Sequence, residues 1–138
     1  MAVHVFGFLM WTGTLMSCLF LLKGHQSVAE AGRGALSAVE RKVAIFMDAS
    51  ALVAIVAGLY AATGFGVNAF NPKQSGAWLH IKTLLVAGLV GIHVFTRIKV
   101  RKYRNGEISP LPGLVIPLTL ILIAIIVAFG EVKTLMRP

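Results

Sequence analysis

Four long apolar runs constrain this chain more than any other feature. They cover residues 3–22, 43–64, 77–96 and 111–130. A bilayer with a hydrocarbon core about 30 Å thick needs about 20 apolar residues for each helical span. Hydrophobic residues make up 57% of the chain and charged residues 13%, which is more apolar surface than a soluble core of this size could bury. The sequence predicts an all-α fold, an integral membrane four-helix bundle in which residues 1–138 form a single transmembrane domain.

The positive charge is unevenly placed around these runs. The formal net charge is +8. Nine basic residues lie in the two segments that follow the first and third runs: Lys23, Arg33, Arg41, Lys42, Arg97, Lys99, Arg101, Lys102 and Arg104. Only Lys73, Lys133 and Arg137 lie on the opposite side. By the positive-inside rule, the sequence predicts an N-out/C-out protein with cytoplasmic basic loops. The expected location is a bacterial-type inner membrane. The basic segments are then expected to bind anionic lipid headgroups, and no nucleic acid partner is expected.

Asp48 is the one carboxylate well inside an apolar run. An unpaired charge at that depth costs several kcal/mol, so the group is either protonated or partnered. The basic residues near its depth are Lys23, Arg41, Lys42, His93 and Arg97. Two interpretations remain open. An ion pair that ties two helices together is favoured somewhat over a proton relay on the inner side.

His4 and His80 come from different runs but lie at similar depth near the outer face. Two neutral imidazoles facing each other across a bundle are suitable axial ligands for haem. Hydrogen bonding of both rings to interfacial water is the competing interpretation. Trp11 shares a helix face with His4, where it either covers a planar ligand or packs on a neighbouring helix. Lys82 either extends toward the headgroups or holds an anionic group such as a propionate or a quinone oxygen.

Three further residues carry weaker expectations. His25 follows the first run and is expected in solvated loop surroundings. His93 lies near the inner end of the third run, and the sequence leaves open whether it or His25 is a ligand. Cys18, the sole cysteine, is expected to be a small buried hydrophobe.

Small residues and prolines predict how the helices pack and where they start. Ala54, Gly58 and Ala62 recur every four residues, and a shorter pair follows at Ala87 and Gly91. Such stripes allow close helix approach, so the tightest contact is expected between the second and third runs.

In the fourth run, Pro112 is expected near the first helical turn, and Pro117 is expected to bend the helix or mark its true start. Residues 27–42 form a weak pattern for a separate amphipathic surface helix.

Two of these regions resemble a known family. The segment Ser75-Gly76-Ala77-Trp78-Leu79-His80-Ile81-Lys82, with His93 and a basic stretch ending at Gly106-Glu107, is similar to the third span of the HemJ family. These are small four-span membrane proteins linked to protoporphyrinogen oxidation, with bound b-type haem. His4, Gly7 and Trp11, with the later His25, match that family's His-x-x-Gly-x-x-x-Trp pattern.

The resemblance favours haem b held by His4 and His80 over hydrogen bonding to interfacial water. It implies His80 and Lys82 as site residues, with His4 next. The chain also departs from the pattern. Phe20 stands where the family has an arginine, the region of Asp48 replaces its Thr-Pro, and its Asn-Glu-x-Pro before the fourth span is not clearly present near Pro117. These changes remove polar groups from a catalytic pocket.

The resulting hypothesis is electron transfer from a reduced tetrapyrrole through haem toward membrane quinone. In it His4 and His80 are ligands and Trp11 lies beside the cofactor. Lys82 holds an anionic group, and Asp48 passes protons at the inner side. The alternative is a non-catalytic small subunit of a larger respiratory or photosynthetic membrane complex. A homo-oligomer is a further possible assembly. A small transporter has little support, because no run shows a clear break at mid-membrane.

Overall fold

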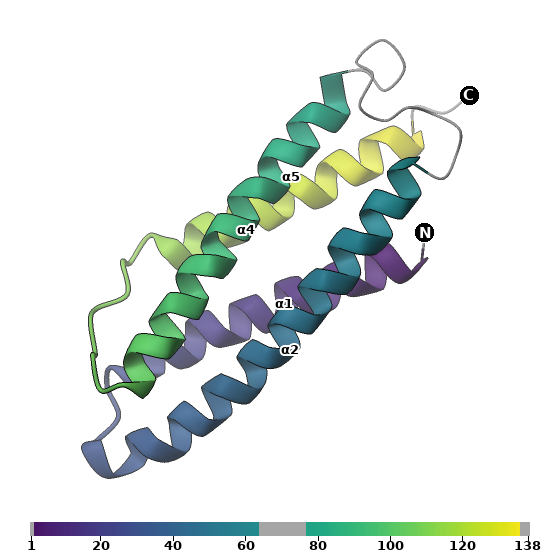
Figure 1. Cartoon of the computed structure of the whole chain (residues 1–138). Helices are drawn as coiled ribbons and strands as arrows, with labels where there is room; N and C mark the ends of the chain where they lie inside the picture. Colours follow the sequence, from purple (N-terminus) through teal and green to yellow (C-terminus); the bar gives the residue numbers. More distant parts are fainter. Residues whose placement is uncertain (1, 64–76, 136–138) are drawn as a thin grey trace.

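The computed structural model describes residues 2–63 and 77–135, with side chains described for 2–62 and 80–129. Four helices form: α1 (Ala2–His25), α2 (Glu30–Thr63), α4 (Ala77–Arg104) and α5 (Val115–Leu135) (Figure 1). No strand occurs in the described ranges. The all-α prediction with four helices is therefore confirmed. The expected outer loop, 65–76, lies outside the described residues.

Three of the helices have the length and composition to cross a membrane. They are α1, residues Glu30–Ala62 of α2 and residues His80–Arg104 of α4. In α5 (Val115–Leu135), the apolar stretch within the residues whose side chains are described is Val115–Phe129, which is shorter than a full span. The helix lengths and compositions therefore support the membrane character that the apolar runs predict.

Two helix starts differ from the sequence expectation. Residues 30–42 do not form a separate surface helix, because α2 runs without interruption from Glu30 to Thr63. The fourth helix begins at Val115, so Pro117 lies in its first turn, where a missing N–H is tolerated. Pro112 lies in the turn before the helix, where its carbonyl accepts a hydrogen bond from Val115 N at 3.0 Å. Pro117 marks the start of the helix rather than a bend within it.

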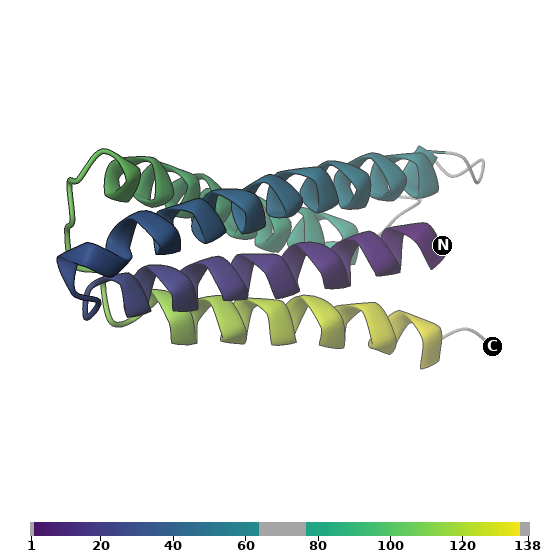
Figure 2. The same ribbon diagram turned by 90° about the horizontal axis from the view of Figure 1, so that it is seen from below.

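The helices form two antiparallel pairs, α1 with α2 and α4 with α5, and the pairs lie side by side (Figures 1 and 2). The first residues of α1 and the last residues of α5 lie at one end of the bundle, which we call the terminal end. The connections 26–29 and 105–114 lie at the other end, which we call the basic end because Lys23, Arg101 and Arg104 are exposed there.

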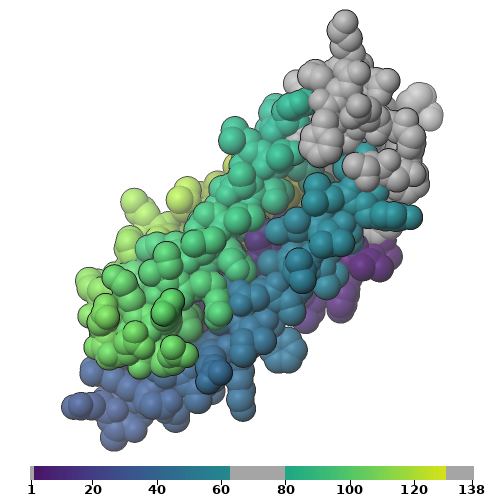
Figure 3. Space-filling view, viewed as in Figure 1, coloured from purple at the N-terminus to yellow at the C-terminus, as the bar shows by residue number. Residues whose placement is uncertain are grey.

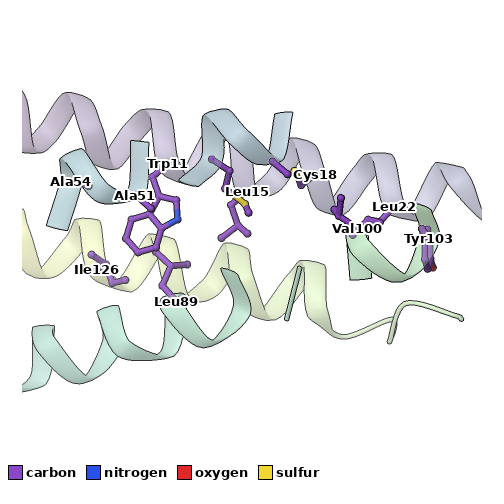
Figure 4. Packing of buried hydrophobic residues seen from close by; sticks show 12 residues of the cluster. Trp11, Leu15, Cys18, Leu22, Ala51, Ala54, Leu89, Val100, Tyr103 and Ile126 are labelled. Atoms are coloured by element: carbon purple, nitrogen blue, oxygen red, sulfur yellow. The ribbon is translucent and has the colours of Figure 1, made fainter. Parts of the chain in front are cut away.

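A continuous apolar core joins all four helices (Figure 4). On α1 the core residues are spaced by four, three and four, and on α2 by three, four and three, so each set forms one helix face. The core consists of Trp11, Leu15, Cys18, Leu22, Ala44, Met47, Ala51, Ala54, Leu89, Val100, Tyr103 and Ile126. Cys18 is buried among them, as expected for a small hydrophobe.

The tightest helix contact is between α1 and α2, not between α2 and α4 as the small-residue stripes suggested. A Cβ atom at Gly7 would lie 2.9 Å from the backbone nitrogen of Ala54. The Gly58 position meets the ring of His4 instead of a residue of α4. At Gly91 a Cβ atom would meet nothing within 4 Å. Glycine and alanine of α2 therefore accommodate the first helix.

Large apolar side chains also cover the outside of the bundle. Phe6, Phe46, Leu52 and Leu84 are each at least 65% exposed. Soluble proteins rarely expose contiguous apolar surface of this kind, whereas a lipid-facing helix requires it. The exterior therefore agrees with the composition in favouring a membrane environment.

Candidate functional site

A chain of polar contacts joins α1, α4 and α2 inside the bundle. Trp11 Nε1 donates to His93 Nδ1 at 3.0 Å. The other nitrogen of that ring, Nε2, lies 3.1 Å from Asp48 Oδ1. Asp48 Oδ2 is 3.2 Å from Arg97 Nη2. The structure thus confirms the ion-pair interpretation of Asp48 and selects two of the five candidate partners, while a relay role stays a prediction.

The direction of these hydrogen bonds fixes the tautomer of His93. An indole N–H can only donate, so His93 Nδ1 must be the acceptor. The neutral ring then carries its proton on Nε2 and donates it to Asp48. Both ring nitrogens are occupied, so this arrangement leaves His93 no nitrogen for a metal. Trp11 itself is 1% exposed and contacts Phe8 and His93 edge to face.

The chain of contacts runs from the core to the surface. The side chain of His93 is 14% exposed, whereas those of Asp48 and Arg97 are 41% and 39% exposed. The inner part therefore holds the helices together, and the outer part is accessible along the line where α2 and α4 meet. The space-filling view shows these two helices side by side on one face of the molecule (Figure 3).

His4 is held in a defined orientation against α2. Its Nδ1 lies 2.8 Å from the carbonyl oxygen of Ala54 and therefore donates to it. The ring occupies the space that glycine leaves at position 58, where a Cβ atom would approach His4 Cε1 to 2.8 Å. The proton on Nδ1 leaves Nε2 as the nitrogen with a free lone pair. Histidine ligands of metals usually have this arrangement, with the other nitrogen bonded to a carbonyl or carboxylate.

The second predicted ligand, His80, lies near the start of α4, which is at the terminal end of the bundle, as is His4. Its side chain is exposed. Lys82 is half-buried in the same turn region and has an interaction partner. The structure places His4 and His80 at the same end but does not show the two imidazoles meeting. The shared haem stays a prediction.

His25 is not solvated, which corrects the sequence expectation. It is 1% exposed, and its Nδ1 lies 2.8 Å from Oε1 of Glu40, which is 0% exposed. The ring also packs edge to face on Tyr103, with centroids 5.1 Å apart. The pair ties the last turn of α1 to α2 and α4. Among the described residues, Glu40 Oε2 is the one buried side-chain oxygen with no hydrogen-bond partner.

Tyr103 extends this second cluster to the connection before α5. Its hydroxyl donates to the carbonyl of Ser109 at 2.5 Å and accepts from Gln26 Nε2 at 3.0 Å. Lys99 Nζ is bonded to Ser109 Oγ at 2.7 Å and to the carbonyl of Pro110 at 3.2 Å. The basic end is therefore closed by a polar network that fixes both connections.

The sequence did not identify the roles of Glu40, Tyr103 and His93. Glu40 and Tyr103 lie where basic residues dominate, and their burial depends on how α1, α2 and α4 align. Trp11 and His93, which are hydrogen-bonded, lie 82 residues apart in the sequence, so no local sequence pattern could predict their contact. The one usable signal was depth: His93 was among the basic groups near the level of Asp48.

Other possible sites are sparse in the part of the chain that the structure describes. It holds no group of three or more His, Cys, Asp or Glu arranged to bind a metal ion. A shallow apolar groove of about 260 Å³ lies between α4 and α5 and includes Gly91, Phe95 and Pro112. It contains none of the predicted site residues. No protein-family model, curated protein or solved structure matches the chain.

Proposed function

We propose that this chain is a HemJ-type membrane protein that crosses the bilayer four times and binds b-type haem or a porphyrin. The proposed orientation is N-out/C-out, with the basic end in the cytoplasm. The exposed Lys23, Arg101 and Arg104 at that end support this orientation, because basic residues remain on the cytoplasmic side. The exposed apolar exterior supports the membrane location.

The observation that carries the haem proposal is the orientation of His4. Its Nδ1 is occupied by the carbonyl of Ala54 at 2.8 Å, and Gly58 leaves room for the ring. A hydrogen bond of this kind orients an imidazole and raises its basicity as a ligand. His80 is exposed at the same end of the bundle and would supply the second nitrogen. His93 and His25 are less suitable, because each is already paired within the bundle.

The remaining residues fit an oxidation of a reduced tetrapyrrole. Haem, when bound, supplies one-electron chemistry. Lys82 would hold an anionic group such as a propionate, and Asp48, at the middle of α2, would exchange protons with the cytoplasmic side. Removing two electrons and two protons from the tetrapyrrole balances the reduction of one quinone to hydroquinone. The transfer of electrons to membrane quinone therefore needs no further reactant.

The test is the absorption spectrum of the purified protein, oxidised and reduced, with single-residue variants. The unmodified protein should show a Soret band that shifts on reduction. His4→Ala and His80→Ala should each abolish or shift this band, because each would remove one of the two imidazoles proposed to hold the haem.

His93→Gln is the matched control. It also removes an imidazole from a helix interior, but both nitrogens of His93 are bonded to Trp11 and Asp48. The folded fraction of this variant should keep the Soret band. A purified protein without a Soret band, even after incubation with haem, would contradict the proposal.

The second candidate is a non-catalytic subunit of a larger membrane complex. The observation in its favour is the exposure of α4, because 11% of the residues in its most apolar stretch are buried, compared with 39% in α1. A partner protein could cover that surface in place of lipid. Migration as a large defined complex in mild detergent, with no bound pigment, would favour this candidate.

A further inference from the structure

The ion pair of Asp48 and Arg97 lies in an unusual place for two charged groups. Asp48 follows the exposed Arg41 and Lys42 by six or seven residues, which is about 10 Å along α2 at 1.5 Å per residue. In the proposed orientation the pair therefore lies deeper than the lipid phosphates. Both side chains nevertheless remain about 40% exposed. Exposed charges at hydrocarbon depth are costly and commonly mark functional sites.

Arg97 extends toward the membrane interior rather than toward the headgroups. Side chains on a helix lean toward its N-terminus, which for α4 is the terminal end. Arg97 is near the basic end, yet its Nη2 reaches Asp48 Oδ2 at 3.2 Å. The carboxylate thus holds the guanidinium at a depth from which a long side chain would otherwise extend to water.

The pair retains unused hydrogen-bonding capacity. A guanidinium has five N–H donors. Among the described residues, Arg97 contacts Asp48 through one nitrogen, Nη2. Asp48 in turn can accept more bonds than the two it receives from His93 and Arg97. Residues one turn away on the same helices are exposed and apolar: Ile45 and Leu52 beside Asp48 on α2, and Val94 beside Arg97 on α4.

We infer that this part of the α2–α4 line of contact binds the head group of a membrane-dissolved quinone. Three features agree with this ligand class. The donors of Arg97 suit a quinone carbonyl, and the carboxylate of Asp48 suits a hydroquinone hydroxyl. The apolar side chains beside them suit the flat ring and the isoprenoid tail. Access is lateral, from the bilayer, which is where such a ligand dissolves.

The inference rests on the proposed function, in which quinone receives the electrons of the tetrapyrrole. It adds the position of the acceptor site and assigns Arg97 to it. Trp11 and His93 are positioning residues, since they hold Asp48 from the inner side and do not face the bilayer.

Fluorescence quenching of Trp11 provides a test that does not depend on haem. Quinones quench indole emission, and Trp11 is linked to Asp48 through one imidazole. A Trp78→Phe background leaves Trp11 as the only tryptophan. This protein, haem-free and in phospholipid vesicles, is titrated with decylubiquinone. Saturable quenching is expected, and Arg97→Gln should weaken the affinity about tenfold, as expected for loss of a charge-assisted hydrogen bond.

Arg101→Gln is the matched control, because it removes the same charge one turn away on an exposed position of α4. Its titration curve should equal that of the background protein. If Arg97→Gln does not fold, Arg97→Lys keeps the charge and should still weaken binding several-fold.

Quenching that rises linearly without saturation, or equal curves for the Arg97 and Arg101 variants, would overturn the inference. A Soret band without saturable quenching leaves the haem proposal intact. Saturable quenching without a Soret band supports the quinone site and removes the haem.

Discussion

At the scale of single residues, the geometry around His4 makes Gly58 a sensitive position. A methyl group there would approach His4 Cε1 to 2.8 Å, closer than a Cβ atom comes to a non-bonded neighbour in real proteins. Gly58→Ala should therefore turn the ring from the Ala54 carbonyl and weaken or shift the Soret band. Gly91→Ala is the control, since a Cβ atom there meets nothing within 4 Å. Equal spectra for the two variants would show that the orientation of His4 does not matter for haem.

Trp11 provides a second test at this scale. Trp11→Phe preserves an aromatic ring but leaves His93 Nδ1 without its donor inside the bundle. The loss of one buried hydrogen bond should lower the free energy of unfolding by about 1–3 kcal/mol. Titration with SDS in mixed micelles measures this quantity. A variant as stable as the unmodified protein would mean that the Trp11–His93 contact contributes nothing.

For the buried pair of His25 and Glu40, we expect two substitutions of Glu40 to lower stability by different amounts. Glu40→Ala removes the partner of a buried imidazole and should cost about 3–5 kcal/mol of stability. Glu40→Gln keeps an oxygen for His25 Nδ1 on a side chain of nearly the same size, so its cost should be clearly smaller. The same SDS titration compares them. Equal losses for both variants would indicate that His25 does not need an acceptor at this position.

At the scale of helices, the contact between α1 and α2 depends on Gly7. A Cβ atom at this position would lie 2.9 Å from the Ala54 backbone nitrogen and 3.1 Å from its Cα. Because backbone cannot move aside as a side chain can, Gly7→Ala should lower stability by about 1–3 kcal/mol. Gly13→Ala, with open space around it, should be neutral or slightly stabilising. Equal stability of the two variants would contradict the observed packing.

The helices also show which parts of the fold the sequence could predict. Four helices followed from four apolar runs, because the requirement for length and hydrophobicity is local. The partner of the stripe at Ala54 and Gly58 did not follow. A small-residue stripe permits close approach but does not say which helix approaches. The starts of α2 and α5 were shifted for a related reason, since apolar runs mark hydrophobic segments and not helix ends.

The candidate site was predictable to a similar extent. Depth placed His93 and Arg97 near Asp48, and both proved to be its partners. Burial of His25 was not predictable, because its partners Glu40 and Tyr103 come from two other helices. The polar residues at the end of the first run predict a solvent-exposed His25, but the packing of three helices buries it. The relation between His4 and His80 likewise depends on packing between helices, so it stays a prediction.

At the scale of the whole molecule, the central claim is that two imidazoles from different helices ligate one haem. The most direct measurement is the electron paramagnetic resonance spectrum of the purified ferric protein. Two imidazole ligands predict a low-spin signal that is lost in both His4→Ala and His80→Ala and retained in His93→Gln. A high-spin signal, a low-spin signal that survives both alanine substitutions, or no bound haem would contradict the account.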